Sequence, residues 1–249
     1  MGNMVQEEIR IPMAAGTAEA AVYRPEGEGH WPGVLLLTDI GGIRPAYHDL
    51  ARRLAGAGYV VLMPNVFFRT ARPPVLDHKS GDEQAFRKRL AELTSPLTPE
   101  AIESDAAIYV ELLSRQPAVR PDSRVGVAGY CYTGAFALRV AAACAGRVAA
   151  AASFHGGNLV TGTPTSPHLL LPRIQARLYF GHAVNDRTMP AEAIRQLEAA
   201  LEAWGGQYES ETYEGAYHSW TASDSPVYNA PQAERAFSKL TELYAATLR

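Results

Sequence analysis

Cysteine is scarce in this chain of 249 residues, which contains only Cys131 and Cys144. Two cysteines cannot build the disulfide framework of a small secreted domain, so a reducing compartment is the simpler expectation and we predict a cytoplasmic protein. The chain also lacks an apolar run of 18 residues, and its start has neither the basic nor the apolar segment of a signal peptide. We therefore expect no membrane partner.

A surplus of positive charge is also absent, because 23 Lys and Arg stand against 26 Asp and Glu, for a formal net charge of −3. We therefore expect no nucleic acid as a partner. No group of His, Cys and Asp has the spacing of metal ligands, so we expect no metal. The glycine pairs at 41–42 and 156–157 are not followed by a phosphate-loop pattern, so we expect no nucleotide and no other cofactor.

What the chain does contain is enough apolar residues, 47%, for a sizeable core, and we predict one domain over residues 1–249. Apolar or β-branched runs predict strands at 5–11, 18–23, 33–38, 59–63, 124–128, 148–154, 176–181 and 207–213. Helical patterns predict helices at 45–57, 82–93, 99–115, 135–144, 191–204 and 231–248. This alternation predicts an α/β fold with one doubly wound, mostly parallel sheet and helices on both faces.

Two regions depart from the alternation. The strands at 5–11 and 18–23 flank a short turn and predict an antiparallel ribbon at a sheet edge. Residues 64–99 are rich in Pro and charge, and we interpret them as a loop-and-helix excursion over one face of the sheet, because the alternation resumes after them.

The segment 124–134, RVGVAGYCYTG, predicts where a site would lie. A short buried strand runs into a tight turn and then into an alanine-rich helix, which is the setting of the nucleophile elbow of α/β-hydrolases. Cys131 occupies the position of the nucleophile. Taken alone, the segment fits a βα turn with a buried cysteine equally well, because free cysteine is among the most buried residue types.

Polar side chains follow the predicted strands, at the edge where ligand sites of such sheets lie. They are Asp39, Cys131, His155, His182, Asp186 and His218. Cys131, Asp186 and His218 come in the order nucleophile, acid, base. An imidazole can take the proton of a thiol and later give it to a leaving group, and a carboxylate behind the imidazole fixes its tautomer. The N–H groups of Tyr132 and Ile40 are the natural donors to an oxyanion.

The two other histidines of this set, His155 and His182, have interpretations other than that of the catalytic base. We expect His182 beside the site or in the pocket wall rather than as the base. His155 is expected either to line the pocket or to be a loop histidine with its hydrogen bonds satisfied.

Several motifs in register resemble the dienelactone hydrolase family: TDIGG, PNVFF, DEQAF, GYCYTG, NDRTMP and GAYHSW. The resemblance runs from about residue 33 to the end of the chain. It implies one α/β-hydrolase domain and a triad of Cys131, His218 and Asp186 that cleaves esters or lactones. It also implies an acid that follows the first buried strand and contacts the resting cysteine. That acid is usually Glu and is Asp39 here.

Other positions depart from the family pattern. Thr133 stands where the elbow usually has Gly, and a β-branched residue should crowd the turn against the neighbouring strand. The arginines that hold the carboxylate of dienelactone in the family are replaced by Ala222 and Asp82. Arg69 is a candidate for a replacement clamp, although such a residue is more often an ordinary surface charge.

We therefore predict a hydrolase of a small-molecule ester or lactone, with a substrate preference that differs from the family's. The predicted substrate pocket contains His155, Phe86, Trp220 and Arg69, and the protein is expected to be a monomer or a homodimer. Two alternatives stay open. One is a general carboxylesterase with an apolar pocket. The other is a hydrolase-fold binding protein without catalysis, which Thr133 and the missing arginines favour.

Overall fold

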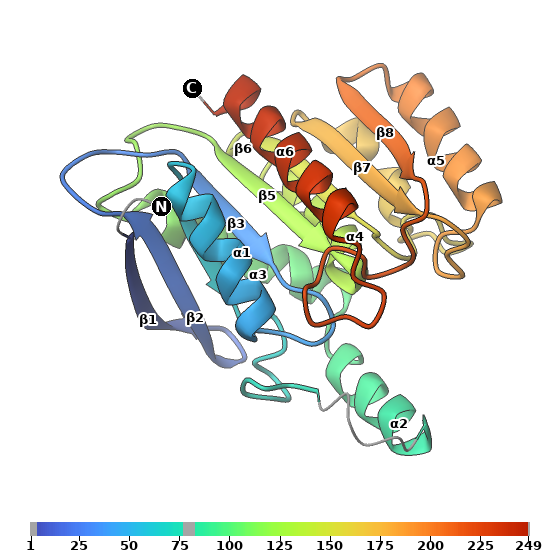
Figure 1. Cartoon of the computed structure of the whole chain (residues 1–249), viewed down its shortest axis with the longest axis horizontal. Coiled ribbons are helices and arrows are strands. Elements are labelled where there is room, and N and C mark those ends of the chain that lie inside the picture. The colour runs from blue at the N-terminus through green and yellow to red at the C-terminus, as the bar shows by residue number, and fades with distance from the viewer. Residues whose placement is uncertain (1–3, 77–82, 249) are drawn as a thin grey trace.

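The computed structural model describes residues 4–76 and 83–248 (Figure 1). Its strands are β1 (Met4–Met13), β2 (Gly16–Pro25), β3 (Gly33–Leu37), β4 (Val60–Pro64), β5 (Val125–Tyr130), β6 (Val148–Phe154), β7 (Arg177–Ala183) and β8 (Tyr208–Tyr213). Its α-helices are α1 (Pro45–Gly56), α2 (Glu83–Thr94), α3 (Pro99–Ser114), α4 (Gly134–Ala143), α5 (Ala191–Trp204) and α6 (Ala230–Thr247). Two 3-10 helices are η1 (Cys131–Thr133) and η2 (Pro167–Arg173).

The strands form one sheet in the order β1-β2-β4-β3-β5-β6-β7-β8. β1 pairs antiparallel with β2, and β2 pairs antiparallel with β4. Every pairing from β4 across to β8 is parallel. The predicted edge ribbon and the predicted mostly parallel sheet are therefore confirmed.

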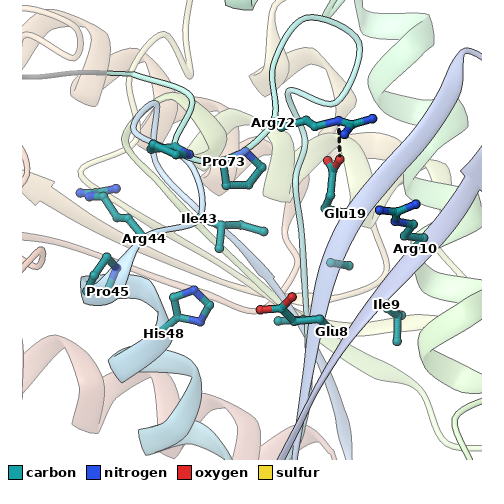
Figure 2. A pocket seen from close by; sticks show the side chains of 13 residues that line it. Glu8, Ile9, Arg10, Glu19, Ile43, Arg44, Pro45, His48, Arg72 and Pro73 are labelled. Carbon is teal, nitrogen blue, oxygen red and sulfur yellow. Dashed lines mark ion pairs between the residues drawn. The ribbon is translucent and has the colours of Figure 1, made fainter.

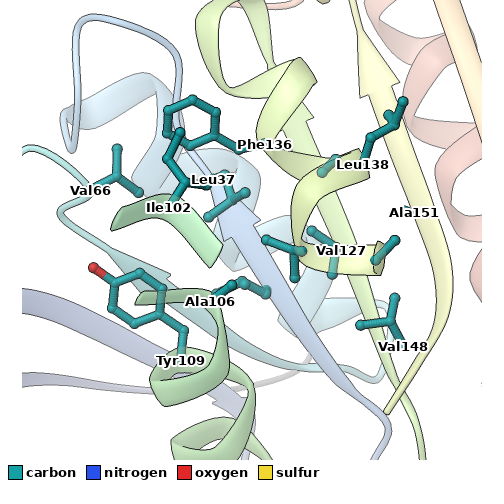
Figure 3. Close-up of a cluster of buried hydrophobic side chains, with 14 of the residues drawn as sticks. Leu37, Val66, Ile102, Ala106, Tyr109, Val127, Phe136, Leu138, Val148 and Ala151 are labelled. Carbon is teal, nitrogen blue, oxygen red and sulfur yellow. The ribbon is translucent and has the colours of Figure 1, made fainter. Parts of the chain in front are cut away.

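The pleat of the central strands divides the core between the two faces of the sheet. All of β3 is buried; Leu35 and Leu37 belong to one hydrophobic cluster, and Val34 and Leu36 belong to the other. Helices α3, α4 and α5 supply the first cluster, part of which Figure 3 shows, and α1 and α6 supply the second. Strands that are apolar on both faces need such a double cover, and for this reason continuous apolar runs predicted them correctly.

The segment between β4 and α3 leaves the sheet. Figure 1 shows α2 apart from the sheet, and Leu93 is its one buried side chain. Thr98 caps α3 by accepting a hydrogen bond from the N–H of Ala101 at 3.2 Å, and Pro99 is the first residue of that helix. Both features of α3 confirm the start predicted from the sequence. No helix within residues 4–76 and 83–248 combines the length and the apolar character that crossing a membrane requires.

Candidate active site

Cys131 lies in a strained turn at the carboxyl end of β5. It is the first residue of η1, and its φ of +55° falls in the left-handed region, which residues other than Gly seldom adopt. Glycines make this turn possible. A Cβ on Gly129 would lie 2.1 Å from the carbonyl oxygen of Thr133, and one on Gly134 would lie 2.5 Å from the Cα of Gly156. The turn leaves the side chain of Cys131 half-buried, at the edge where the parallel strands end.

Three side chains form a hydrogen-bonded row at this edge. His218 Nε2 lies 3.0 Å from Cys131 Sγ, and His218 Nδ1 lies 2.6 Å from Asp186 Oδ2. Asp186 Oδ1 accepts hydrogen bonds from the N–H and the hydroxyl of Thr188, at 2.8 and 2.7 Å. The residues of the row follow β5, β7 and β8, so the parallel sheet brings together positions that lie far apart in the chain.

The charges of the row follow from these contacts. Burial opposes a charge on His218, but hydrogen bonds to Asp186 and Cys131, and the charges of those groups, outweigh burial and raise the pKa of the imidazole to about 10. Burial also opposes the charge on Asp186, and the hydrogen bonds from His218 and Thr188 outweigh it and lower the pKa of that carboxyl. The row thus stabilises an imidazolium between a carboxylate and a sulfur.

The elbow accommodates Thr133, contrary to the crowding that we expected. Its side chain is fully buried, and its hydroxyl accepts a hydrogen bond from the N–H of Tyr130 at 3.0 Å. The same hydroxyl lies 3.1 Å from the carbonyl oxygen of Leu37, to which it donates. The threonine therefore ties the elbow to β3, a contact that glycine at this position could not make.

Removing this hydroxyl should weaken the fold. Thr133→Val keeps the shape of the side chain but removes its hydrogen bonds to the buried backbone groups of Tyr130 and Leu37, so we expect a loss of about 1–3 kcal/mol in the free energy of unfolding. Thr133→Ser keeps the hydroxyl and should lose clearly less. Urea denaturation of the two variants measures the difference. Equal losses would contradict the role given to the hydroxyl.

The hydrogen bonds of Asp39 differ from those that the family resemblance implies. Arg44 Nη1 and Nη2 lie 2.5 and 2.9 Å from the two carboxylate oxygens, and the N–H of Gly41 lies 2.8 Å from Oδ1. Among the described residues no hydrogen bond joins Asp39 to Cys131. The shorter aspartate is held by a neighbouring cation instead of by the thiol.

Two residues predicted to line the substrate pocket lie beneath the row. Trp220 is fully buried and His155 is 1% exposed, so a substrate on the surface of the site does not touch them. The ring of His155 packs edge-on against His218 and Trp220, with centroid distances of 5.3 and 4.9 Å, and its Nε2 lies 2.7 Å from the Thr221 hydroxyl. Burial lowers the pKa of His155 well below its usual value. His155 therefore packs against His218 from inside the protein, and Trp220 packs against His155 in turn.

The other predicted pocket residues are also engaged elsewhere. Arg69 Nη1 and Nη2 lie 2.6 and 2.9 Å from the carboxylate of Asp105 on α3, so this arginine ties down a loop and is not an open clamp. Phe86 lies on α2, partly buried against the first hydrophobic cluster. Ala222 is buried and brings no charge. Asp82 lies outside the described residues.

His182 is a buried residue of β7 and not part of the row. It is 2% exposed, its Nε2 lies 3.2 Å from the hydroxyl of Ser210, and its ring stacks on that of Phe180. Burial lowers its pKa from 6.5 to about 4, although the charge of Asp186 opposes the shift. This histidine is therefore neutral in the folded protein at neutral pH.

The neutral state of His182 predicts a loss of stability in acid. The unfolded chain takes up a proton as the pH falls below 6.5 and the folded chain does so only near 4, so stability is full above 6.5 and is lost between the two values. At 1.36 kcal/mol per pKa unit, the loss is about 3 kcal/mol. His182→Gln should flatten the dependence of the unfolding free energy on pH, whereas His30→Gln, in an exposed loop, should not. Parallel curves for wild type and His182→Gln would contradict this.

Sequence reasoning missed two residues that organise the site, Arg44 and Thr188. A signal for Thr188 was present, because a hydroxyl residue placed two positions after an aspartate often closes a side-chain turn. Arg44 carried no such signal, since its partners include a residue 180 positions away.

Two hollows near the row differ in what lines them. One of about 180 Å³ adjoins the elbow, with the apolar side chains of Tyr132, Ala135 and Phe136 on one side and the polar residues Asn158 and Thr161 on the other. A groove of about 770 Å³ lies between the β1–β2 ribbon, the start of α1 and the segment Arg72–Pro74 (Figure 2), and its lining contains no member of the row. The lining of the smaller hollow also contains no member of the row, but it includes Tyr132, the residue that follows Cys131. Within residues 4–76 and 83–248, no group of three or more His, Cys, Asp and Glu could hold a metal.

Comparison with known proteins agrees with this architecture. A protein of Rhodococcus opacus named carboxymethylenebutenolidase is 32% identical over 190 residues, which cover 76% of this chain and 70% of the relative. A solved dienelactone hydrolase-like promiscuous phosphotriesterase from metagenomic libraries superposes with a TM-score of 0.81 at 20% identity, with both chains covered completely. The dienelactone hydrolase of Anabaena variabilis superposes with a TM-score of 0.70 at 17% identity, with 99% of each chain covered.

These likenesses confirm the predicted α/β-hydrolase fold. The sequence model of one family, the dienelactone hydrolase family, matches residues 18–248, which is nearly the whole chain. Fold, sequence and family match agree, and the chain belongs to the dienelactone hydrolase family.

Proposed function

We propose that this protein hydrolyses small esters or lactones, with Cys131 as the nucleophile. The observation that carries the proposal is the row of sulfur, imidazole and carboxylate, with distances of 3.0 and 2.6 Å. His218 takes the thiol proton, and Asp186 orients the ring and stabilises its charge. The raised pKa of His218 favours the form in which the imidazole holds that proton.

The reaction runs in two halves. The thiolate of Cys131 attacks the acyl carbon, and the tetrahedral intermediate collapses as His218 gives its proton to the departing alkoxide, which leaves as an alcohol. A water then attacks the thioester while His218 takes one of its protons. The C–S bond breaks, and the carboxylic acid leaves with Cys131 regenerated.

The donors that we propose for the oxyanion are the N–H groups of Tyr132 and Ile40. Tyr132 lies in the first turn of η1, where helical N–H groups have no partner within the helix. In the turn after β3, the N–H groups that bond back to Asp39 are those of Gly41 and Gly42, which leaves Ile40 outside these bonds. Both donors lie at the end of the sheet where the charge on the oxyanion would develop.

The contacts of the arginines favour a neutral substrate over an anionic one. Arg139 lines the small hollow, but its guanidinium lies 3.4 Å from Glu103 and donates to the carbonyl of Thr165. Arg69 is bound to Asp105. The general carboxylesterase with an apolar pocket is therefore the second candidate, and a panel of neutral esters and anionic lactones separates it from a lactonase like the Rhodococcus relative.

The test is to trap the acyl-enzyme. Incubation with 4-nitrophenyl acetate followed by rapid acid quenching should add one acetyl group to the chain, and peptide mapping should place it on Cys131. Cys144 is the internal control, because it is buried and burial raises the pKa of its thiol. An acetyl group on Cys144, or turnover that survives complete alkylation of Cys131, would reject Cys131 as the nucleophile. Neither acetylation nor turnover would leave a hydrolase-fold binding protein as the better account.

A further inference from the structure

Arg44 lies between two loops that border the row. It directly precedes α1, and its side chain is 14% exposed. In Figure 2 its guanidinium points away from Glu8 and Glu19, the acids of the large groove. It is directed instead at two aspartates that lie 185 positions apart in sequence, Asp39 and Asp224.

The contacts use both sides of the guanidinium. Nη1 and Nη2 bind the two oxygens of Asp39 at 2.5 and 2.9 Å, and Nε and Nη2 bind the two oxygens of Asp224 at 2.7 and 3.1 Å. Paired contacts of this kind fix direction as well as distance, because the planar fork of arginine matches the carboxylate. The group also lies over the ring of Tyr47, 4.9 Å from its centroid.

The two aspartates belong to different loops. Asp39 lies in the loop between β3 and α1, next to Ile40. Asp224 lies in the loop between β8 and α6, which also carries His218. A guanidinium held by both carboxylates therefore fixes the distance between a proposed oxyanion donor and the proposed base.

The two halves of this bridge differ in exposure. The side chain of Asp39 is 7% exposed and that of Asp224 is 44% exposed. Salt screens an exposed pair strongly and a buried pair much less, so the Asp224 half is the one that solvent can weaken.

We propose that Arg44 is a positioning residue that fastens the loop of Ile40 to the loop of His218, and so holds the oxyanion donor and the base in register. The inference rests on the proposed function of the row. Arg44 takes no part in bond making. Its loss would displace groups that must be aligned when the thiolate attacks, and such a misplacement lowers turnover more than it lowers substrate binding.

The experiment compares Arg44→Met and Asp224→Asn with a matched control. The control is Arg53→Met, on the same helix, because Arg53 Nη2 forms an exposed ion pair with Glu234 at 2.6 Å that joins α1 to α6 and reaches neither loop. With 4-nitrophenyl acetate, Arg44→Met should lower kcat by about 10-fold to 100-fold with KM changed less than about threefold. Asp224→Asn should lower kcat by less, and Arg53→Met should stay within about twofold of wild type.

The dependence of kcat on salt is a second measurement, and it would not change if Arg44 had only a structural role. The kcat of wild type should fall between about 0.05 M and about 1 M NaCl, as the Asp224 half is screened, and that of Asp224→Asn should stay flat. A double variant, Asp39→Asn with Arg44→Met, removes the unpaired carboxylate. It should stay impaired if register is the cause, and recovery to wild-type turnover would overturn the inference.

Hydrogen–deuterium exchange separates this inference from the proposed function. Peptides that cover residues 39–42 and 217–224 should exchange faster in Arg44→Met and at the wild-type rate in Arg53→Met. Faster exchange in Arg44→Met, together with a wild-type chain that hydrolyses no ester, would leave the bridge standing and reject the proposed function. Unchanged exchange together with unchanged kcat in Arg44→Met would overturn the bridge while the hydrolase stands.

Discussion

Replacing Cys131 with alanine is expected to lower kcat for 4-nitrophenyl acetate by at least about 10⁴-fold, because the group that forms the acyl-enzyme is gone. The hydrogen-bonded row explains why this variant tests the sulfur alone. His218 and Asp186 stay in place, so what is lost is the sulfur and nothing of the machinery that activates it. Steady-state rates, with the rate of the buffer alone subtracted, measure the effect.

The rest of the row sharpens this prediction. Members of a catalytic unit act together, so His218→Gln should cost nearly as much as Cys131→Ala, and the double variant should cost no more than the larger of the two. Cys144→Ala is the matched control and should turn over at the wild-type rate, since that thiol is buried at the C-terminal end of α4. A Cys131→Ala variant that keeps more than about a tenth of wild-type turnover would reject the thiol as the nucleophile.

Replacing Gly129 with alanine is the second large effect, and it acts on folding. The new Cβ would lie 2.1 Å from the carbonyl oxygen of Thr133 and 2.7 Å from its carbonyl carbon. Both atoms are backbone, so no flexible side chain can move aside, and the turn itself would have to open. We expect a loss of more than about 4 kcal/mol in the free energy of unfolding, or no folded protein at all.

Gly56→Ala is the control for that variant. A Cβ at Gly56 meets no atom within 4 Å, and the residue ends α1, so alanine there should be neutral or stabilising by about 0.5–1 kcal/mol. Urea denaturation compares the two, with soluble yield as a second readout. Gly129→Ala with an unfolding midpoint equal to that of wild type would contradict the close approach of β5 and the elbow.

Most of the sheet could be predicted because buried parallel strands appear in the sequence as uninterrupted apolar runs. The apolar run at 33–38 predicted a strand that is buried on both faces of the sheet. In the structure, the two faces of β3 pack in the two hydrophobic clusters. The residues that could hold a row were also predictable, because polar side chains after parallel strands meet at one edge of the sheet.

What lies around the row was harder to predict, because it depends on contacts across the chain. Trp220 was predicted to line the pocket and His155 was one candidate for it, but both rings are buried, with His155 packed between His218 and Trp220. From the sequence, Arg69 was a candidate to bind a substrate carboxylate. In the structure it forms an ion pair with Asp105 of α3. Thr133 looked too large for the elbow, since a sequence does not show that a carbonyl of β3 lies ready to accept from its hydroxyl.

The order of the strands also determines which strands lie at the edges of the sheet, where the sheet of a second molecule could pair. The sheet ends in β1 on one side and β8 on the other, and both would offer unpaired backbone groups to a second molecule. β1 carries the exposed residues Glu7, Glu8, Arg10 and Pro12, while β8 holds Glu209 and Glu211 in ion pairs with Arg177, Lys239 and Arg235. Charge at both edges, and proline in β1, oppose edge-to-edge addition of another sheet.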